Sequence, residues 1–222
     1  MAKARTAAAT RATPAVDEQD LRARILHASV ALIDEQGLGS LSMREVARRA
    51  GVSHQAPYHH FEDRAAILAA ICEEGFGELR RRMHAAQSPA PKDVSELLER
   101  CGVAYVAFAR AHPAHFRIMF RPELVEMEKF PAAHCKAEEA FGELVHIVQK
   151  YVDHGRGWKG KEQALISLCW SVSHGLASLL LDGPLRMKQP EATAQLDHHV
   201  KDVMRAFRVM VEAGLTRGGE AG

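Results

Sequence analysis

Residues 42–68 carry the side chains whose types and spacing best suit chemistry in this chain. The segment reads SMREVARRAGVSHQAPYHHFEDRAAIL. Its centre, HQAPYHHF, holds three histidines, a glutamine and a tyrosine, and side chains of these types hydrogen-bond to base edges and to phosphate oxygens. This stretch is also too short and too polar to be a core element. The pattern therefore indicates a surface that contacts nucleic acid rather than a catalytic centre.

The residues around this stretch predict a helix-turn-helix. A short helix, MREVARRA, comes first, and Gly51 then supplies the positive φ that a tight turn needs. Val52 fills the angle between the two helices, and Ser53 is a suitable N-cap for the second because its hydroxyl accepts a backbone N–H. A third helix begins near Asp63. A short helix, a glycine turn and a polar second helix are typical of a helix-turn-helix unit.

The same run resembles the DNA-binding domain of tetracycline-repressor-type (TetR) transcriptional regulators. The resemblance rests, without a gap, on residues 42–47, 50–53, 58–61, 64 and 67–68. The chain departs from the usual pattern where Gln55 replaces a frequent Gly, Pro57 a frequent Leu or Ile, and Arg64 a frequent Lys. With Ser53 as the cap, Pro57 lies in the first turn, where a proline costs less than the ~3 kcal/mol of a mid-helix position. These changes bear on base preference rather than on the fold.

The resemblance also implies roles for individual residues. Phosphate contacts are expected from Ser42, Ser53, Tyr58, His59 and Arg64, since helix N-termini and polar side chains bind phosphate oxygens. Base contacts are expected from Arg44, His54, Gln55 and Ala56, because Arg can read guanine, Gln adenine and an alanine methyl the thymine methyl. The alternative is that these residues are an ordinary solvated surface.

Composition indicates an all-α chain. The sequence has 222 residues, only 6% of them aromatic, and a net charge of +1. DNA binding must therefore depend on local charge rather than on a global basic field. The four scattered cysteines, Cys72, Cys101, Cys135 and Cys169, favour reduced thiols in a cytoplasmic protein. We expect no membrane span or signal peptide, because no apolar run reaches ~18 residues.

The 13 histidines raise the question of a metal site. The nearest candidates are the pair His112 and His115 and the adjacent pair His198 and His199. A metal needs further ligands that converge from elsewhere, and adjacent helical residues point to different faces. We therefore expect neither a metal nor a cofactor.

Composition changes along the chain predict its domains. Residues 1–16 form a disordered, mildly basic arm, which is either a solvated tail or a DNA-contacting arm. Residues 17–64 form the helix-turn-helix domain, with a first helix over 18–36, and residues 65–88 form a connecting helix that stops before Ser88-Pro89-Ala90-Pro91. Residues 92–215 form a regulatory and dimerisation domain, with helices over 93–111, 114–120, 132–154, 161–181 and 191–213. Residues 216–222 are a frayed tail.

Two sets of residues in the second domain suggest binding surfaces. Trp170, His174 and Gly175 resemble the Trp-(x3)-His-Gly signature of one TetR-type regulatory domain. A ligand pocket for a mostly apolar small molecule is expected among Phe108, His112, Phe116, Met119, Phe120, Phe141, Trp170 and His174, although ordinary core packing explains many of these residues equally well. A dimer interface, as a four-helix bundle, is expected from Leu168, Val172, Leu176, Leu179, Val200, Val203, Phe207 and Val211, which exceed a single apolar stripe on each helix.

These features favour one function over two alternatives. We expect a sequence-specific transcriptional regulator that binds a palindromic operator in double-stranded DNA as a homodimer. We further expect a repressor that an unidentified small-molecule effector releases, with an activator as the open alternative. The other function classes are an enzyme on a helical scaffold, for which no nucleophile–base or paired-carboxylate set stands out, and a ligand-binding or adaptor protein that no longer binds DNA.

Overall fold

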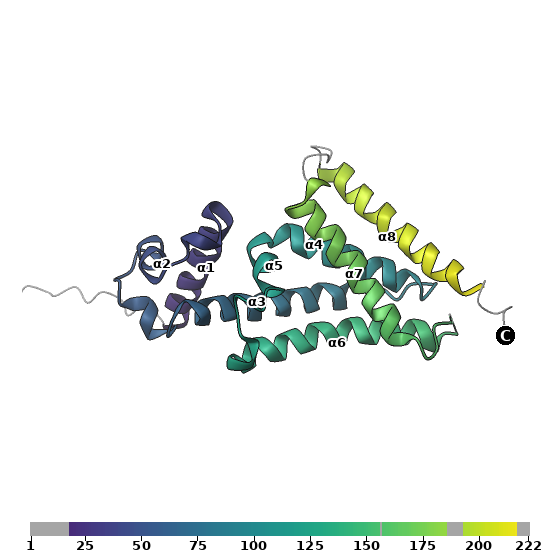
Figure 1. The fold of residues 1–222 in the computed structure, drawn as a ribbon, viewed down its shortest axis with the longest axis horizontal. Helices are drawn as coiled ribbons and strands as arrows, with labels where there is room; N and C mark the ends of the chain where they lie inside the picture. Colours follow the sequence, from purple (N-terminus) through teal and green to yellow (C-terminus); the bar gives the residue numbers. More distant parts are fainter. Residues whose placement is uncertain (1–17, 156, 186–192, 217–222) are drawn as a thin grey trace, which may run out of the picture.

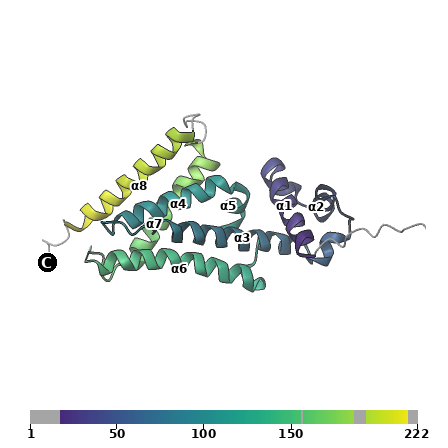
Figure 2. The ribbon, with the colours of Figure 1, turned by 180° about the vertical axis from the view of Figure 1, so that it is seen from behind.

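The computed structural model describes residues 18–155, 157–185 and 193–216, and every regular element in these residues is helical. The all-α prediction is confirmed. Figure 1 shows α1 and α2 at one end, α3 running from them into a larger bundle, and α4 to α8 within that bundle; Figure 2 shows the same arrangement from behind. The predicted arm, residues 1–16, and the predicted tail beyond residue 216 lie outside the described residues.

The elements of the small end follow the sequence closely. They are α1 (Glu18–Gln36), η1 (Leu38–Ser40), α2 (Met43–Ala50) and η2 (Ala56–His59), followed by α3 (Arg64–Ala85). Helix α2 begins at Ser42, whose hydroxyl oxygen accepts the backbone N–H of Glu45 at 3.3 Å. It ends at Gly51, which adopts φ 67° and so supplies the left-handed residue that the turn needs. Ile25, Val46 and Phe61 are buried where the helices meet.

The recognition segment corrects one prediction, because it is not an α-helix over residues 54–61. It forms a single 3-10 turn at Ala56–His59, and Ser53 provides its backbone carbonyl to Ala56 at 3.0 Å rather than a side-chain cap. Pro57 is the physical reason: it has no N–H to donate to the Ser53 carbonyl, which an α-helix would require. Tyr58 accordingly donates to Gln55 at 3.1 Å, one residue closer than an α-helical partner.

Helix α3 is buried at both ends of the molecule. Ile67 and Leu68 are buried near its start, where it packs against α1, whereas Leu79 and Met83 are buried further along, where it packs against α4 and α6. Gly75 marks its closest approach to α5, because a Cβ there would lie 2.4 Å from Met119 Sδ and 3.2 Å from the Cβ of His115. The buried residues on both sides of the predicted domain boundaries, after residues 64 and 88, therefore belong to one continuous core. The division into a DNA-binding domain, a connecting helix and a regulatory domain stays a proposal.

The larger end contains α4 (Glu96–Ala111), α5 (Pro113–Met119), η3 (Met127–Lys129), α6 (Pro131–Asp153), α7 (Glu162–Leu181) and α8 (Thr193–Thr216). The predicted helices are all present, with ends shifted by a few residues. Helix α4 begins three residues late because the Asp93 carboxylate accepts the N–H of Ser95 at 3.0 Å and holds a turn there. Helix α7 is long and apolar enough to cross a membrane by length and composition. Core helices pass the same test, and α7 packs on α4 and α6.

The N-cap of α3 gives a stability prediction. Asp63 Oδ1 accepts the backbone N–H of Ala66 at 2.8 Å. Asp63→Ala should therefore lower the free energy of unfolding by about 1 kcal/mol, measured by urea denaturation, because it leaves a helix-end donor without its partner. Asp63→Ser should recover most of this loss. Glu62→Ala, which removes a neighbouring exposed carboxylate, is the matched control, and an equal loss in that variant would contradict the capping role.

Candidate functional site

The predicted DNA-contacting residues gather on one end of the molecule, and most of them reach solvent. Ser42, Arg44, Ser53, His54, Gln55, Tyr58, His59 and Arg64 are exposed. Tyr58 is 46% exposed, a large value for a tyrosine, and its ring lies 6.0 Å from that of His54. Ala56 is the exception, because it is only 8% exposed and packs into the domain. The Ala56 methyl group therefore does not reach a base, and we no longer count it among the predicted base contacts.

Two of these side chains already have roles within the protomer. The Ser42 hydroxyl caps α2, and Arg64 Nη2 donates to the carbonyl of Leu38 at 3.0 Å, which ties the start of α3 to η1. Both remain exposed and retain donors for phosphate. Their contribution to DNA binding would therefore be combined with a structural one, which makes them poor choices for a clean mutational test.

Ion pairs distinguish the three arginines of α2. Arg48 pairs with Glu45 and Arg49 pairs with Glu35, whereas Arg44 has no ion-pair partner among the described residues. The hydrogen bond to Arg48 holds the pKa of Glu45 below its ordinary value, so this carboxylate stays charged and neutralises its neighbour. Arg44 is thus the α2 cation with its charge free for an external anion.

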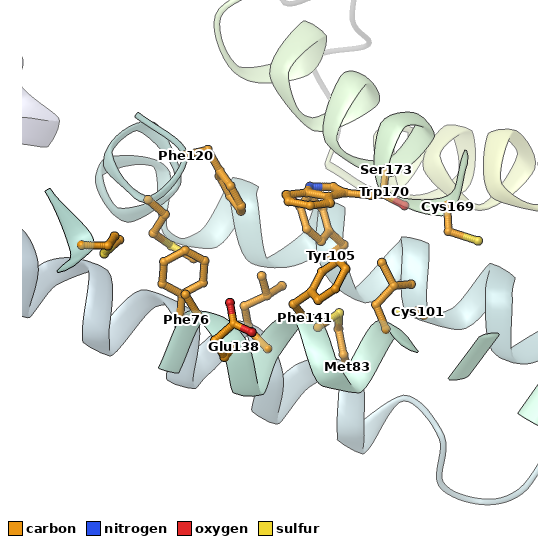
Figure 3. Close-up of a pocket in the computed structure, with 16 residues that line it drawn as sticks. Phe76, Met83, Cys101, Tyr105, Phe120, Glu138, Phe141, Cys169, Trp170 and Ser173 are labelled. Atoms are coloured by element: carbon orange, nitrogen blue, oxygen red, sulfur yellow. The ribbon is translucent and has the colours of Figure 1, made fainter. Parts of the chain in front are cut away.

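The second candidate site is a cavity of about 400 Å³ in the larger end. Figure 3 shows its lining side chains, which come from α3, α4, the end of α5, the segment that follows it, α6 and α7. Met119, Phe120, Phe141 and Trp170 are the predicted pocket residues that line it. His174 instead lines a neighbouring, more open cavity that shares Met119, Phe120, Met127 and Trp170 with the first.

The other predicted pocket residues do not line either cavity. Phe108 and Phe116 are buried core residues. His112 lies half-buried where Arg82 Nη2 donates to its Nε2 at 3.1 Å. Burial, and after it the charge of Arg82, lower the pKa of His112, so the ring is neutral and accepts this hydrogen bond. These three residues hold the helices together and do not reach a cavity ligand.

Sequence analysis missed most of the cavity wall. The additional lining residues are Phe76, Leu79, Met83, Cys101, Tyr105, Met127, Ala137, Glu138, Ala140, Leu144, Cys169 and Ser173. A usable signal existed in α6, where residues 137, 140, 141 and 144 recur at the spacing of one helical face. The same spacing also describes ordinary core, so the pattern alone does not separate a lining residue from a packed one.

Polar groups in the cavity wall are largely occupied. The Tyr105 hydroxyl lies 2.9 Å from His174 Nδ1. Burial lowers the pKa of His174 and raises the pKa of Tyr105, an effect that outweighs the lowering by its hydrogen bond with Trp170. The ring is therefore neutral and the phenol protonated, and the two groups share one hydrogen bond whose direction is set by the imidazole tautomer. Burial also raises the pKa values of Cys101 and Cys169 to about 12, which keeps both thiols protonated.

The thiols give a prediction about reactivity. At pH 8 a thiol with a pKa of about 12 is thiolate in about one molecule in ten thousand. Iodoacetamide should therefore alkylate exposed Cys135 at least ten times faster than Cys72, Cys101 or Cys169, as mass spectrometry of the folded protein would measure. In urea the four rates should converge. Alkylation of Cys101 or Cys169 as fast as that of Cys135 in the folded protein would contradict the burial described here.

The geometry defines a helix-turn-helix protein with an apolar cavity in its larger end. Comparison with known proteins identifies its family. Residues 25–71 match the family model described as bacterial regulatory proteins, tetR family. Residues 98–203 match the tetracyclin repressor-like C-terminal domain, and this region includes the Trp170–Gly175 stretch. Together the two matches cover more than half of the chain. The chain belongs to the TetR family of bacterial regulatory proteins.

Solved structures share the fold of this chain. A solved structure of unknown function from Rhodococcus sp. RHA1 is 28% identical, with a TM-score of 0.71, over 88% of this chain and 95% of that one. The TetR family transcriptional regulator PfmR from Thermus thermophilus is 20% identical, with a TM-score of 0.64, over 86% of this chain and 97% of its own. This second likeness concerns the fold.

A curated relative is similar over a short part of the chain. The HTH-type transcriptional regulator AcrR of Shigella flexneri is 36% identical over 66 residues, which are 28% of this chain. The match spans only 31% of AcrR, about a third of its length. It therefore supports a helix-turn-helix regulator and gives no information about effector or target.

Proposed function

We propose that this chain is a cytoplasmic transcriptional repressor that binds a palindromic operator as a homodimer and is released by a small molecule. The observation that carries the proposal is the polar recognition segment, with His54, Gln55 and Tyr58 exposed beside the start of α3. A phosphate contact from Tyr58 would set the register, and Arg44 and Gln55 would read base edges. The same geometry accommodates an activator, which differs in operator position rather than in protein chemistry.

Binding rather than catalysis is favoured by the state of the cavity. Its two thiols are held protonated by burial, and its phenol is protonated and bound to His174. These groups lack an activated nucleophile beside a free base, which an enzyme of this kind would need. We therefore infer a regulatory pocket that needs no cofactor.

The outer faces of α7 and α8 are the proposed dimer surface. Both helices pack on α4, and each leaves apolar residues in solvent: Leu168 (40%) and Leu179 (43%) on α7, Val209 (51%) and Met210 (64%) on α8. Leu176, Val200, Phe207 and Val211, which we expected in the interface, are buried within the protomer, while Val172 and Val203 are partly buried. The proposed interface therefore centres on Leu168 and Leu179, with the exposed end of α8.

Selection of genomic DNA fragments that bind the purified protein tests the DNA-binding proposal directly. A retrieved palindrome whose halves are about one helical turn apart supports an operator-binding dimer. Absence of enrichment over competitor DNA would favour the alternative, a ligand-binding or adaptor protein whose recognition segment no longer reads DNA.

Two substitutions separate base reading from phosphate binding. Gln55→Ala should relax base preference at one or two positions, at a cost of about 1–3 kcal/mol for the preferred sequence. Tyr58→Phe should weaken binding to all sequences alike, because a phosphate contact positions the protein without specifying sequence. A position-weight profile from selected oligonucleotides measures the change in base preference, and titration of labelled DNA measures the uniform loss of affinity. Gln149→Ala on distant α6 is the control for both. An unchanged profile for Gln55→Ala would exclude this residue as a base reader.

The dimer surface gives a separate prediction. The double variant Leu168→Glu with Leu179→Glu should raise the dimer dissociation constant about 100-fold or more, because association would bury unpaired carboxylates. Sedimentation velocity measures the change, and circular dichroism checks that the protomer stays folded. Ala132→Glu, an equal change at an exposed position of α6, should leave the dimer intact. A wild-type monomer at micromolar concentration would refute the proposed interface.

A further inference from the structure

The larger-end cavity with the apolar wall has a single acidic residue in its lining. Of the 16 described residues that line it, Glu138 is the one carboxylate, because the others are apolar residues, a serine, a tyrosine and two cysteines. Glu138 lies on the solvent-exposed rim of α6, and Figure 3 shows its carboxylate on the cavity side of that helix. An entering ligand therefore meets a negative charge at the edge of an apolar chamber.

The charge of Glu138 is not neutralised within the described part of the chain. Its acidic neighbours on α6 are paired: Glu139 with Lys136 at 3.0 Å and with Arg80 at 3.2 Å, and Glu143 with His84 at 3.1 Å. Glu138 has no such ion pair among the described residues. The basic groups beside this face are thus committed to other carboxylates, and Glu138 keeps its charge for an external cation.

Aromatic rings form much of the wall behind Glu138. Phe120 meets Phe76 edge to face with centroids 5.6 Å apart, and Trp170 lies 5.6 Å from Phe141 and 6.1 Å from Phe120. Aromatic faces are negative and attract cations, most strongly where water is excluded. An anion would meet both these faces and the Glu138 carboxylate. Because the Tyr105 hydroxyl is already occupied by His174, the wall has few donors to offset that repulsion.

We propose that the cavity binds a lipophilic organic cation, with its apolar body among Phe76, Phe120, Phe141 and Trp170 and its positive charge beside Glu138. This proposal specifies the chemical class of the effector. A role of that effector in operator release rests on the proposed function. It distinguishes this cavity from the neighbouring, more open one, which Glu138 does not line and which exposed Arg121 lines instead. The two cavities would therefore favour ligands of opposite charge.

Two probes of equal shape and opposite charge test this proposal. Tetraphenylphosphonium and tetraphenylborate are titrated into the full chain, with binding followed by calorimetry and by Trp170 fluorescence. We expect the cation to bind more tightly than the anion. Glu138→Gln should weaken cation binding by about 5- to 10-fold, and Glu138→Lys should reverse the preference. Glu128→Gln, which removes an exposed carboxylate on η3 that does not line the cavity, is the matched control and should change neither affinity.

Three results would overturn the proposal: tetraphenylborate binding at least as tightly as the phosphonium, equal effects of Glu138→Gln and Glu128→Gln, or binding of neither probe. Tight anion binding lost on Arg121→Gln would assign the ligand to the open cavity instead. Operator affinity, measured with and without the phosphonium, tests the cation site separately from the proposal that an effector releases the operator. Cation binding that depends on Glu138 but leaves operator affinity unchanged would retain the site and refute its role in release.

Discussion

The burial of α3 at both of its ends in one continuous core is the constraint on which the rest of the structure depends. Its first turns, with Ile67 and Leu68, pack against α1, and its later turns, with Leu79 and Met83, pack against α4 and α6. A helix packed in this way cannot shift at one end without disturbing the packing at the other. The recognition segment and the cavity are therefore mechanically connected by a single element, whatever ligand enters.

Local backbone chemistry made much of the fold predictable, and one residue shows where it failed. Ser42 and Asp63 cap helices and Gly51 adopts the left-handed turn conformation, so the helix-turn-helix and its boundaries could be predicted. Pro57 was expected to be tolerated within a first α-helical turn. Its missing N–H instead leaves a 3-10 turn and buries Ala56, and this outcome depends on how Phe61 and Ala56 pack into the domain. Helix propensity alone does not predict that packing.

The candidate sites were less predictable because lining, core and interface residues share one composition. Phe116 and Phe120 lie four residues apart near the end of α5, yet Phe116 is buried core and only Phe120 lines the cavity. Likewise Leu176 and Leu179 lie on one helix, the first packed inside the protomer and the second in solvent. Helical periodicity indicates that a helix face is apolar. Tertiary packing decides whether a core residue, a cavity or a second protomer covers that face.

The ion pairs of α5 indicate how cavity occupancy can reach the DNA-binding end. Arg117 donates to both Asp182 oxygens at the end of α7, between 2.8 and 3.1 Å, and its guanidinium also lies 3.9 Å from the Asp34 carboxylate of α1. Met119, two residues on, lines the cavity and rests against Gly75 of α3. A ligand that displaces Met119 therefore acts on a helix that contacts both α1 and α3. Such movement changes operator affinity only to the extent that the ligand prefers one arrangement, and tenfold release requires about 1.4 kcal/mol of that preference.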